Sequence, residues 1–224
     1  MKVCLIPARG GSKRIKNKNI KNFFGKPLIS RSILVAKKSK LFDKIFVSTD
    51  SQKIANIAKK SGALIPFLRP KKISGDYASD LDVLHHFLNY TKKEKIKISY
   101  LCYLYPALPL LKVTTLKKCY NLITKSKYTK LMTICRYRNP IQQALKKNKK
   151  GEISFAKNKF KFYRSEDLAS FYYDAGQGYW YDIKKYLKIK NKNKIKIVSV
   201  ELKRHEFQDI NTMEDFRLAE KLFK

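Results

Sequence analysis

The chain is poor in cysteine, in acidic residues and in long hydrophobic runs. It contains no stretch of about 18 consecutive apolar residues, so a membrane-spanning helix is not expected. The N-terminus passes directly into an apolar strand-like run and then into charges, which does not resemble a secretory signal, and we expect a cytoplasmic protein without a membrane partner. The four cysteines are widely spaced and form no metal-type pair, so we expect them to be reduced; Cys4 and Cys102 lie in apolar runs and are predicted to be buried.

The shortage of acidic residues leaves a strongly basic chain. Lys and Arg number 51 against 17 Asp and Glu, a formal net charge of +34 over 224 residues. The lysines are spread along the whole chain among Ile, Asn, Tyr and Phe, a mixture that AT-rich codons produce, and no recognised nucleic-acid motif accompanies them. We therefore expect no specific nucleic-acid partner. The charge should still attract anionic substrates and cause nonspecific RNA binding at low salt.

An apolar run and the basic loop after it dominate the N-terminal region. Val3 to Ile6 is predicted to be a buried strand, and it leads into two adjacent glycines, a serine and five basic side chains. Successive backbone N–H groups in such a loop can form an anion-binding concavity, and Lys13 and Lys18 add charge for phosphate. The spacing matches neither Walker A nor the dinucleotide fingerprint. The pattern indicates polyphosphate binding at the carboxyl end of a strand; an ordinary basic surface loop is the alternative.

The rest of the chain alternates between strand and helix patterns. Strands are predicted at 44–48, 64–68, 98–105, 130–135 and 195–200, and helices at about 28–40, between Ser51 and Gly62, at 79–95, at 113–125 and after Thr212, which forms a capping box with Asp215. This order predicts an α/β fold with a parallel sheet and right-handed crossovers. Residues from about 140 to 173 differ: they are Lys-rich, with short alternations at 153–155 and 160–162, and predict a hairpin-like excursion.

Several motifs carry a family resemblance. The sequence Ile-Pro-Ala-Arg-Gly-Gly-Ser-Lys-Arg-Ile at 6–15, followed by Lys18-Asn19, resembles the opening of the cytidylyltransferases that activate nonulosonic (sialic-type) acids. Segments 47–51, 67–70 and 208–212 recur in the family's order, so the resemblance covers nearly the whole chain. The segment Asp-Ala-Gly-Gln, one residue, Tyr-Trp at 174–180 most resembles the branch that handles pseudaminic acid, although Gly178 stands where that branch usually has a bulkier aromatic residue.

The resemblance implies a fold and an assembly. It implies a single cytidylyltransferase domain over 1–224, with a Rossmann-like nucleotide-diphospho-sugar transferase fold whose mostly parallel central sheet is flanked by helices. Within this domain, residues from about 140 to 173 would form a small β-rich excursion for dimerisation and substrate contact, so a homodimer is implied.

The resemblance also implies a set of site residues. The candidate catalytic residues, which would hold the triphosphate and the leaving pyrophosphate, are Arg9, Lys13 and Lys18. The candidate nucleotide-binding residues are Ala8, Gly10, Gly11, Ser12, Asn19, Arg69, Asp76 and Ala78. The candidate sugar-binding residues are Tyr105, Arg164 and Gln177, with Arg164 facing the substrate carboxylate. The candidate ligands for a Mg²⁺ cofactor are Asp209 and Asn211.

The implied reaction joins CTP to a nonulosonic acid, with pseudaminic acid expected, and yields the CMP-sugar and pyrophosphate for cell-surface or flagellar glycan synthesis. Two departures from the family pattern leave alternatives. Asn211 stands where the family has a second carboxylate, and it is either a neutral ligand or a helix-entry residue. Ala107 and Leu108 replace the small polar residues that the family has near the sugar. The alternatives are the same reaction on N-acetylneuraminic, legionaminic or 3-deoxy-manno-octulosonic acid, or a basic binding protein that has lost catalysis.

Overall fold

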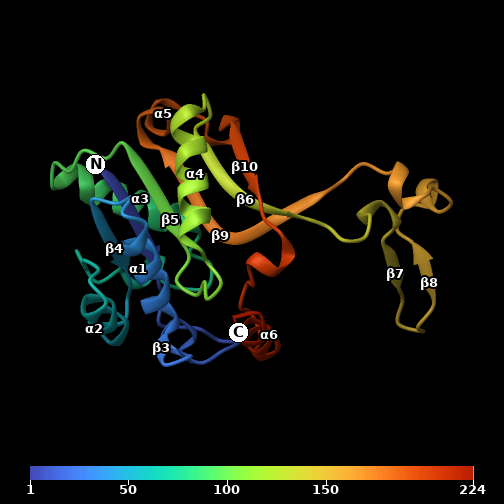
Figure 1. The fold of residues 1–224 in the computed structure, drawn as a ribbon, viewed down its shortest axis with the longest axis horizontal. Helices are drawn as coiled ribbons and strands as arrows, with labels where there is room; N and C mark the ends of the chain where they lie inside the picture. The colour runs from blue at the N-terminus through green and yellow to red at the C-terminus, as the bar shows by residue number, and fades with distance from the viewer. Residues whose placement is uncertain (224) are drawn as a thin grey trace.

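A six-stranded sheet forms the centre of the protein, as seen in a computed structural model that describes residues 1–223 (Figure 1). Its strands are β1 (Lys2–Pro7), β4 (Lys44–Ser48), β5 (Tyr100–Leu104), β6 (Lys130–Arg136), β9 (Tyr172–Asp182) and β10 (Ile197–Glu201). The strand order is β10-β6-β9-β5-β1-β4. β1 runs parallel to β4 and β5, and β6 runs parallel to β10, whereas β9 is antiparallel to both of its neighbours. The predicted mostly parallel sheet is therefore confirmed.

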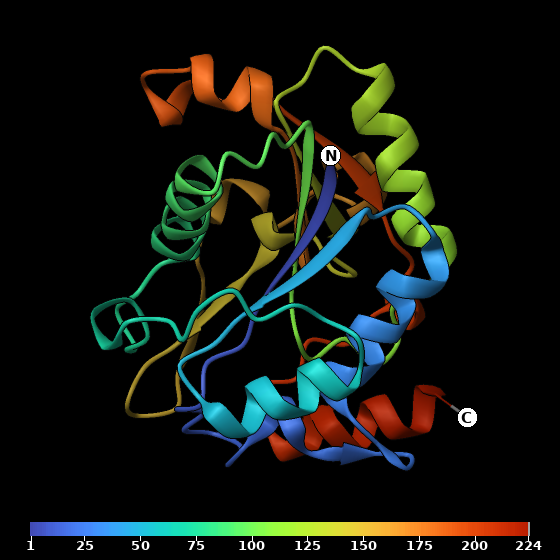
Figure 2. The same ribbon diagram turned by 90° about the vertical axis from the view of Figure 1, so that its left-hand side faces the viewer.

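Helices cover both faces of this sheet (Figure 2). They are α1 (Leu28–Ser39), α2 (Gln52–Lys60), α3 (Asp80–Lys93), α4 (Val113–Lys125) and α5 (Ile183–Lys188). A further helix, α6 (Met213–Phe223), packs instead against the loop after β1 and the start of α1. Alternate residues of β1 point to opposite faces. Cys4 and Ile6 pack in the core formed with α1, α2 and α4, whereas Val3 and Leu5 pack with α3 and α5. Burial on both faces explains why β1 reads as a continuous apolar run.

Two predicted strands are wrong. Residues 64–68 form no regular strand and contribute only isolated bridges from Leu64 to Phe46 and from Leu68 to Thr49. Pro66 lies between these bridges and has no N–H to donate, so the ladder is interrupted there. The alternation at 160–162 does not pair either, because a 3₁₀ turn occupies Asn158–Phe160. The hairpin of β2 (Asn22–Phe23) and β3 (Lys26–Pro27), and the short helix α5, were not predicted.

The segment between β6 and β9 extends away from the sheet (Figure 1). Its hairpin, β7 (Leu145–Lys147) with β8 (Ile153–Phe155), confirms the hairpin expected in this region. Large apolar side chains lie exposed on this extended segment, with Ile153 at 68% and Phe162 at 88% of their full accessible area.

Over the residues that the structure describes, no helix combines the length and the apolar character needed to cross a membrane.

The antiparallel strand β9 is bulged where it passes the middle of the sheet. Its pairing with β6 jumps from Met132–Tyr179 to Ile134–Asp174, so four residues of β9 lie opposite Thr133 alone. Gly178 lies in this bulge with φ +132°, and a Cβ added to it would lie 2.2 Å from the Tyr103 carbonyl oxygen. Only glycine fits that position. The bulge directs Asp174 and Gly176 to the carboxyl end of β5.

We predict that Gly178→Ala lowers the free energy of unfolding by at least about 3 kcal/mol, because the new methyl group would force two central strands apart. Chemical denaturation monitored by circular dichroism measures this change. Gly75→Ala is the matched control: a Cβ added there meets nothing within 4 Å, so a change of at most about 0.5 kcal/mol is expected. Equal effects of the two substitutions would contradict the assigned role of Gly178.

Candidate active site

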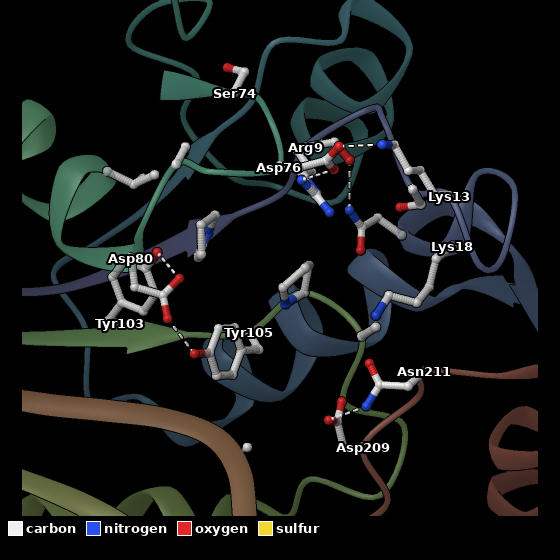
Figure 3. Close-up of a pocket in the computed structure, with 18 of the residues that line it drawn as sticks. Arg9, Lys13, Lys18, Ser74, Asp76, Asp80, Tyr103, Tyr105, Asp209 and Asn211 are labelled. Atoms are coloured by element: carbon white, nitrogen blue, oxygen red, sulfur yellow. Dashed lines mark hydrogen bonds and ion pairs between the residues drawn. The ribbon is translucent and has the colours of Figure 1, made fainter. Parts of the chain in front are cut away.

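A cavity of about 540 Å³ opens at the carboxyl ends of β1 and β5 (Figure 3). Its walls come from the loop after β1, the 69–80 segment, the end of β5, the bulge of β9 and the turn before α6. Open α/β sheets bind ligands at this edge. The predicted site residues that line the cavity are Arg9, Ser12, Lys13, Lys18, Asn19, Arg69, Asp76, Ala78, Tyr105, Asp209 and Asn211.

The remaining predicted residues lie elsewhere. Gly10 and Gly11 lie in the loop beside the cavity, while Ala8 is fully buried behind it. Gln177 is buried in the β9 bulge, and its Oε1 has no hydrogen-bond partner among the described residues. Arg164 lies on the extended segment, exposed and paired with Glu166, and it does not line the cavity of its own chain.

The loop after β1 is shaped by Asp50 at the end of β4. The Gly10 N–H donates to Asp50 Oδ1 at 2.8 Å, and the Ser12 N–H donates to the Gly10 carbonyl at 3.0 Å. Of the three N–H groups from Gly10 to Ser12, only that of Gly11 has no partner within residues 1–223. In this structure the Gly11 N–H is thus the one of the three that remains available to an anion. The sequence analysis counted Asp50 only within the 47–51 segment and did not predict this contact.

Gly10 approaches the start of α2 closely. A Cβ added there would lie 3.1 Å from the Cβ of Ser51, the residue that caps α2. The loop therefore lies tightly against the turn after β4.

Arg9 and Lys13 converge on one carboxylate. Arg9 Nη1 lies 3.0 Å from Asp76 Oδ1 and also donates to the Gly75 carbonyl at 3.2 Å, while the Lys13 ammonium pairs with Asp76 Oδ2 (Figure 3). The hydrogen bond from Lys13 is the largest of the effects that lower the pKa of Asp76. Asp76 thus occupies the place around these cations that an anionic ligand would take.

Lys18 and Asn19 form the deeper part of the same loop. Lys18 Nζ donates to the Ile210 carbonyl at 2.6 Å; burial lowers the pKa of Lys18, and the charge of Asp209 opposes that shift. Asn19 Nδ2 donates to the Arg9 carbonyl at 2.9 Å. The buried Asn19 Oδ1 has no partner among the described residues, which leaves an acceptor at the cavity wall.

Arg69 is a buried cation on the opposite wall. Its side chain is only 5% exposed, and its Nε donates to Ser74 Oγ at 3.1 Å. Burial lowers the pKa of Arg69, with Asp50 opposing the shift, and a guanidinium remains charged throughout the physiological range. Arg69 therefore offers its remaining N–H donors to a ligand.

The far end of the cavity is lined by tyrosines and carboxylates. Tyr103 donates to Asp80 Oδ1 at 2.8 Å and Tyr105 donates to the other oxygen of the same carboxylate, while Tyr179 donates to Asp174 Oδ2 at 2.6 Å. Burial is the main cause that raises the pKa of Tyr103, Tyr105 and Tyr179, so these phenols stay protonated. Of these residues only Tyr105 was predicted as a site residue. Its i, i+2 spacing from Tyr103 on a strand was the signal that would have found the second tyrosine.

The predicted metal ligands lie side by side but are not equivalent (Figure 3). Asn211 Nδ2 donates to Asp209 Oδ2 at 2.5 Å, and Asn211 Oδ1 accepts from Arg14 Nη2 at 2.6 Å. Over the described residues, no group of three or more His, Cys, Asp or Glu gathers for a metal. One carboxylate together with phosphate oxygens is a donor set that suits Mg²⁺, so Asp209 fits such an ion. The Asn211 carbonyl oxygen is contacted by Arg14 in this structure, so Asn211 as a ligand stays a prediction.

The fold and the cavity define an α/β protein with a cationic, ligand-sized cavity at the end of its first strand. Comparison with known proteins identifies the family. The family model described as "Cytidylyltransferase" matches residues 3–221, and the chain belongs to this family. The family resemblance predicted from the motifs is confirmed.

Individual relatives agree with this assignment. The chain is 36% identical to pseudaminic acid cytidylyltransferase of Campylobacter jejuni subsp. jejuni serotype O:2 over 222 residues, which cover 99% of this chain and 96% of the relative. It is 32% identical to a two-function protein of Helicobacter pylori, pseudaminic acid cytidylyltransferase and UDP-2,4-diacetamido-2,4,6-trideoxy-beta-L-altropyranose hydrolase, covering 97% of this chain and 42% of that protein. A solved CMP:2-keto-3-deoxy-manno-octonic acid synthetase complexed with CTP shares the fold with a TM-score of 0.70 at 16% identity, covering 99% of this chain and 97% of that one. The predicted Rossmann-like transferase fold is confirmed.

We predict that inorganic tripolyphosphate raises the melting temperature, because the cations around Asp76 would bind it in the folded state only. The double substitution of Arg9 and Lys13 by Ala should abolish most of the shift, which differential scanning fluorimetry measures. Replacing Lys92 and Lys93 at the end of α3 by Ala removes the same charge far from the cavity and should leave the shift intact. Loss of the shift in both double variants would indicate nonspecific anion binding.

Proposed function

We propose that this protein joins CTP to a nonulosonic acid, pseudaminic acid in the first place, and releases the CMP-sugar and pyrophosphate. The observation that carries the proposal is the polarity of one cavity: cations and a free acceptor amide lie at one end, and tyrosine donors paired with carboxylates lie at the other. Such a cavity suits an anionic nucleotide beside a polar sugar. The full-length similarity to the Campylobacter enzyme supports the choice of substrates.

The triphosphate would bind along the loop after β1. Arg9 and Lys13 would exchange Asp76 for phosphate oxygens, and the Gly11 N–H would add a donor. The anomeric oxygen of the sugar then attacks the α-phosphorus, its bond to phosphorus forms, and the bond from the α-phosphorus to the bridging oxygen breaks to release pyrophosphate. The proton of the attacking anomeric hydroxyl passes to solvent, since no protein group is assigned as its base. Catalysis by these residues consists of positioning and charge stabilisation.

Two side chains are suited to recognise the cytosine base. The unpartnered Asn19 Oδ1 would accept a hydrogen bond from the exocyclic amino group, and the buried Arg69 guanidinium would donate to the ring acceptors. A ligand that satisfies a buried, unpaired acceptor recovers the free energy lost when that acceptor was desolvated. This arrangement would favour cytosine over uracil, which presents a carbonyl in place of the amino group.

At the sugar end, Tyr105, Tyr179 and Asp174 would contact the hydroxyl and acetamido groups of the acid. We propose that residues 1–224 act as one domain in the cytoplasm and that the 140–173 segment pairs with a second copy of the chain. Exposed apolar side chains on that segment, such as Phe162, are consistent with a homodimer. In that assembly Arg164 would be available for the sugar carboxylate.

We propose that Mg²⁺ binds through Asp209 and the phosphate oxygens of CTP. When bound, the ion would neutralise charge that develops on the phosphate oxygens. Asn211 contacts Arg14 and Asp209 in this structure, and its role as a second ligand stays a prediction.

Pyrophosphate release tests the proposed reaction directly. The protein is incubated with CTP, Mg²⁺ and, separately, pseudaminic, N-acetylneuraminic, legionaminic or 3-deoxy-manno-octulosonic acid. Release with pseudaminic acid alone is expected. Release with a different acid would keep the reaction and change the substrate, and CTP binding without release from any acid would indicate a binding protein that has lost catalysis.

We predict that Lys13→Ala lowers kcat by at least about a hundredfold, because the charge on the leaving pyrophosphate would lose a pre-positioned cation. Steady-state assays of pyrophosphate release give kcat and KM. The exposed Lys13 packs against no core residue, so the thermal midpoint should stay within a few degrees of wild type. Turnover near the wild-type value would contradict the role of Lys13.

We predict that Asp209→Asn raises the Mg²⁺ concentration needed for half-maximal activity by about tenfold or more, because an amide replaces the one carboxylate that fits the ion. Titration of Mg²⁺ at saturating CTP measures this value. Asp43→Asn, at the opposite end of the sheet, serves as the control and should leave the titration unchanged. An unchanged titration for Asp209→Asn would remove Asp209 from the ion site.

A further inference from the structure

We propose that Lys130 is a specificity-determining residue for the sugar acid, because its ammonium offsets the charges of Asp80 and Asp174 at the far end of the cavity. This inference rests on the proposed function. Lys130 is the first residue of β6 and does not line the cavity. The sequence analysis counted it only as part of a strand. The observation that carries the inference is the contact between its ammonium and the ring of Tyr179.

The register of the sheet brings Lys130 to the tyrosines of β9. Lys130 is paired with Tyr181, and Tyr179 lies two residues away on the same face of the strand. The Lys130 Nζ lies 3.8 Å from the centre of the Tyr179 ring and 5.6 Å from the centre of the Tyr181 ring. Both distances allow a cation–π interaction. The ammonium is therefore held on the face of the sheet where Tyr181 packs with α3 and α5.

The Lys130 ammonium faces two carboxylates of the cavity without pairing with either. Lys130 is half-buried and forms no ion pair among the residues that the structure describes. Burial lowers the pKa of Lys130, and the charges of Asp174 and then Asp80 oppose that shift. The attraction is mutual, so the ammonium reduces the negative potential of both carboxylates. Partly buried charges are screened little by salt, and this effect therefore reaches the cavity.

The two carboxylates would otherwise make this end of the cavity negative. Asp80 accepts hydrogen bonds from two phenols, and Asp174 accepts from the Tyr179 hydroxyl at 2.6 Å. A phenol is a neutral donor, so it satisfies a carboxylate oxygen without cancelling its charge. A nonulosonic acid carries a carboxylate of its own, which uncompensated aspartates would repel.

Lys130 is placed to remove this repulsion where no other cation does so. Arg69 also faces Asp80, so that carboxylate has a second cation near it. Asp174 is the carboxylate that acts most strongly on Lys130, and the Tyr179 ring that holds the ammonium carries the hydroxyl bound to Asp174. Lys130 thus supports acceptance of an anionic sugar without touching it.

Steady-state release of pyrophosphate gives kcat and KM for CTP and for the sugar acid, with pseudaminic acid expected. Methionine is unbranched and uncharged, so Lys130→Met removes the charge and keeps apolar packing against the ring. We expect KM for the acid to rise about tenfold and KM for CTP to stay within about twofold, because the triphosphate lies at the other end of the cavity. Lys130→Arg keeps the charge and the ring contact and should restore the wild-type KM for the acid.

The charge of the ligand separates an electrostatic role from a structural one. Isothermal titration gives the affinity of the full-length protein for the acid and for its uncharged methyl ester. Lys130→Met should weaken binding of the acid by about tenfold and change binding of the ester by at most about twofold. Equal weakening of both ligands would overturn the proposal, since Lys130 would then act through packing alone.

Lys192 provides a matched control. Its Nζ lies 4.1 Å from the centre of the Tyr186 ring, so Lys192→Met also removes a cation that lies over a tyrosine. Lys192 lies on the turn before β10 and does not line the cavity. This substitution should leave both affinities and both KM values unchanged. Near-ultraviolet circular dichroism and the thermal midpoint establish that each variant is folded.

Failure of this inference and failure of the proposed function give different results. If the wild-type protein releases pyrophosphate and Lys130→Met has an unchanged KM for the acid, the inference alone is rejected. Binding of the acid that depends on Lys130, without release of pyrophosphate, would retain the inference and reject the proposed reaction. A wild-type protein that neither binds the acid nor releases pyrophosphate would overturn both.

Discussion

The site depends on a strand that is enclosed on every side. β1 is paired with β4 on one edge and with β5 on the other, and Val3 to Ile6 have no exposed surface. The loop after β1 meets the turn after β4, and the bond from Gly10 to Asp50 fixes it at that point. From this loop Arg9 and Lys13 reach Asp76, and Lys18 reaches the Ile210 carbonyl.

Within a chain of net charge +34, carboxylates are concentrated around the cavity. Only 17 acidic residues occur in the sequence, yet Asp76, Asp80, Asp174 and Asp209 all line it. Each has a specific partner: Asp76 takes Arg9 and Lys13, Asp80 and Asp174 take tyrosines, and Asp209 takes an amide. The site is thus organised by local pairing of opposite charges and dipoles.

The antiparallel strand β9 gives the cavity its second wall. Its bulge, which only glycine allows at Gly178, carries Asp174 and Tyr179 to the end of β5, opposite the cationic loop. In a regular strand Asp174 and Tyr179, five residues apart, would lie on opposite faces; the bulge brings them to within two positions of each other along β6, and Tyr179 then donates to Asp174. Segment 174–180, which carries part of the family resemblance, is therefore also the segment that forms the bulge.

The sequence by itself determined the α/β class, most helices and strands, the basic loop after β1 and the family. The spacing of apolar residues predicts the helices and strands, and contiguous motifs identify the loop and the family. It failed at 64–68, where Pro66 interrupts a strand that its apolar residues predict. Only the tertiary structure decided that Asp50 takes the Gly10 N–H, that Arg164 lies outside its own cavity, and that Asn211 bridges Arg14 and Asp209. Residues 14 and 211 are joined only when the chain folds, and no local pattern records whether an amide faces a metal or an arginine.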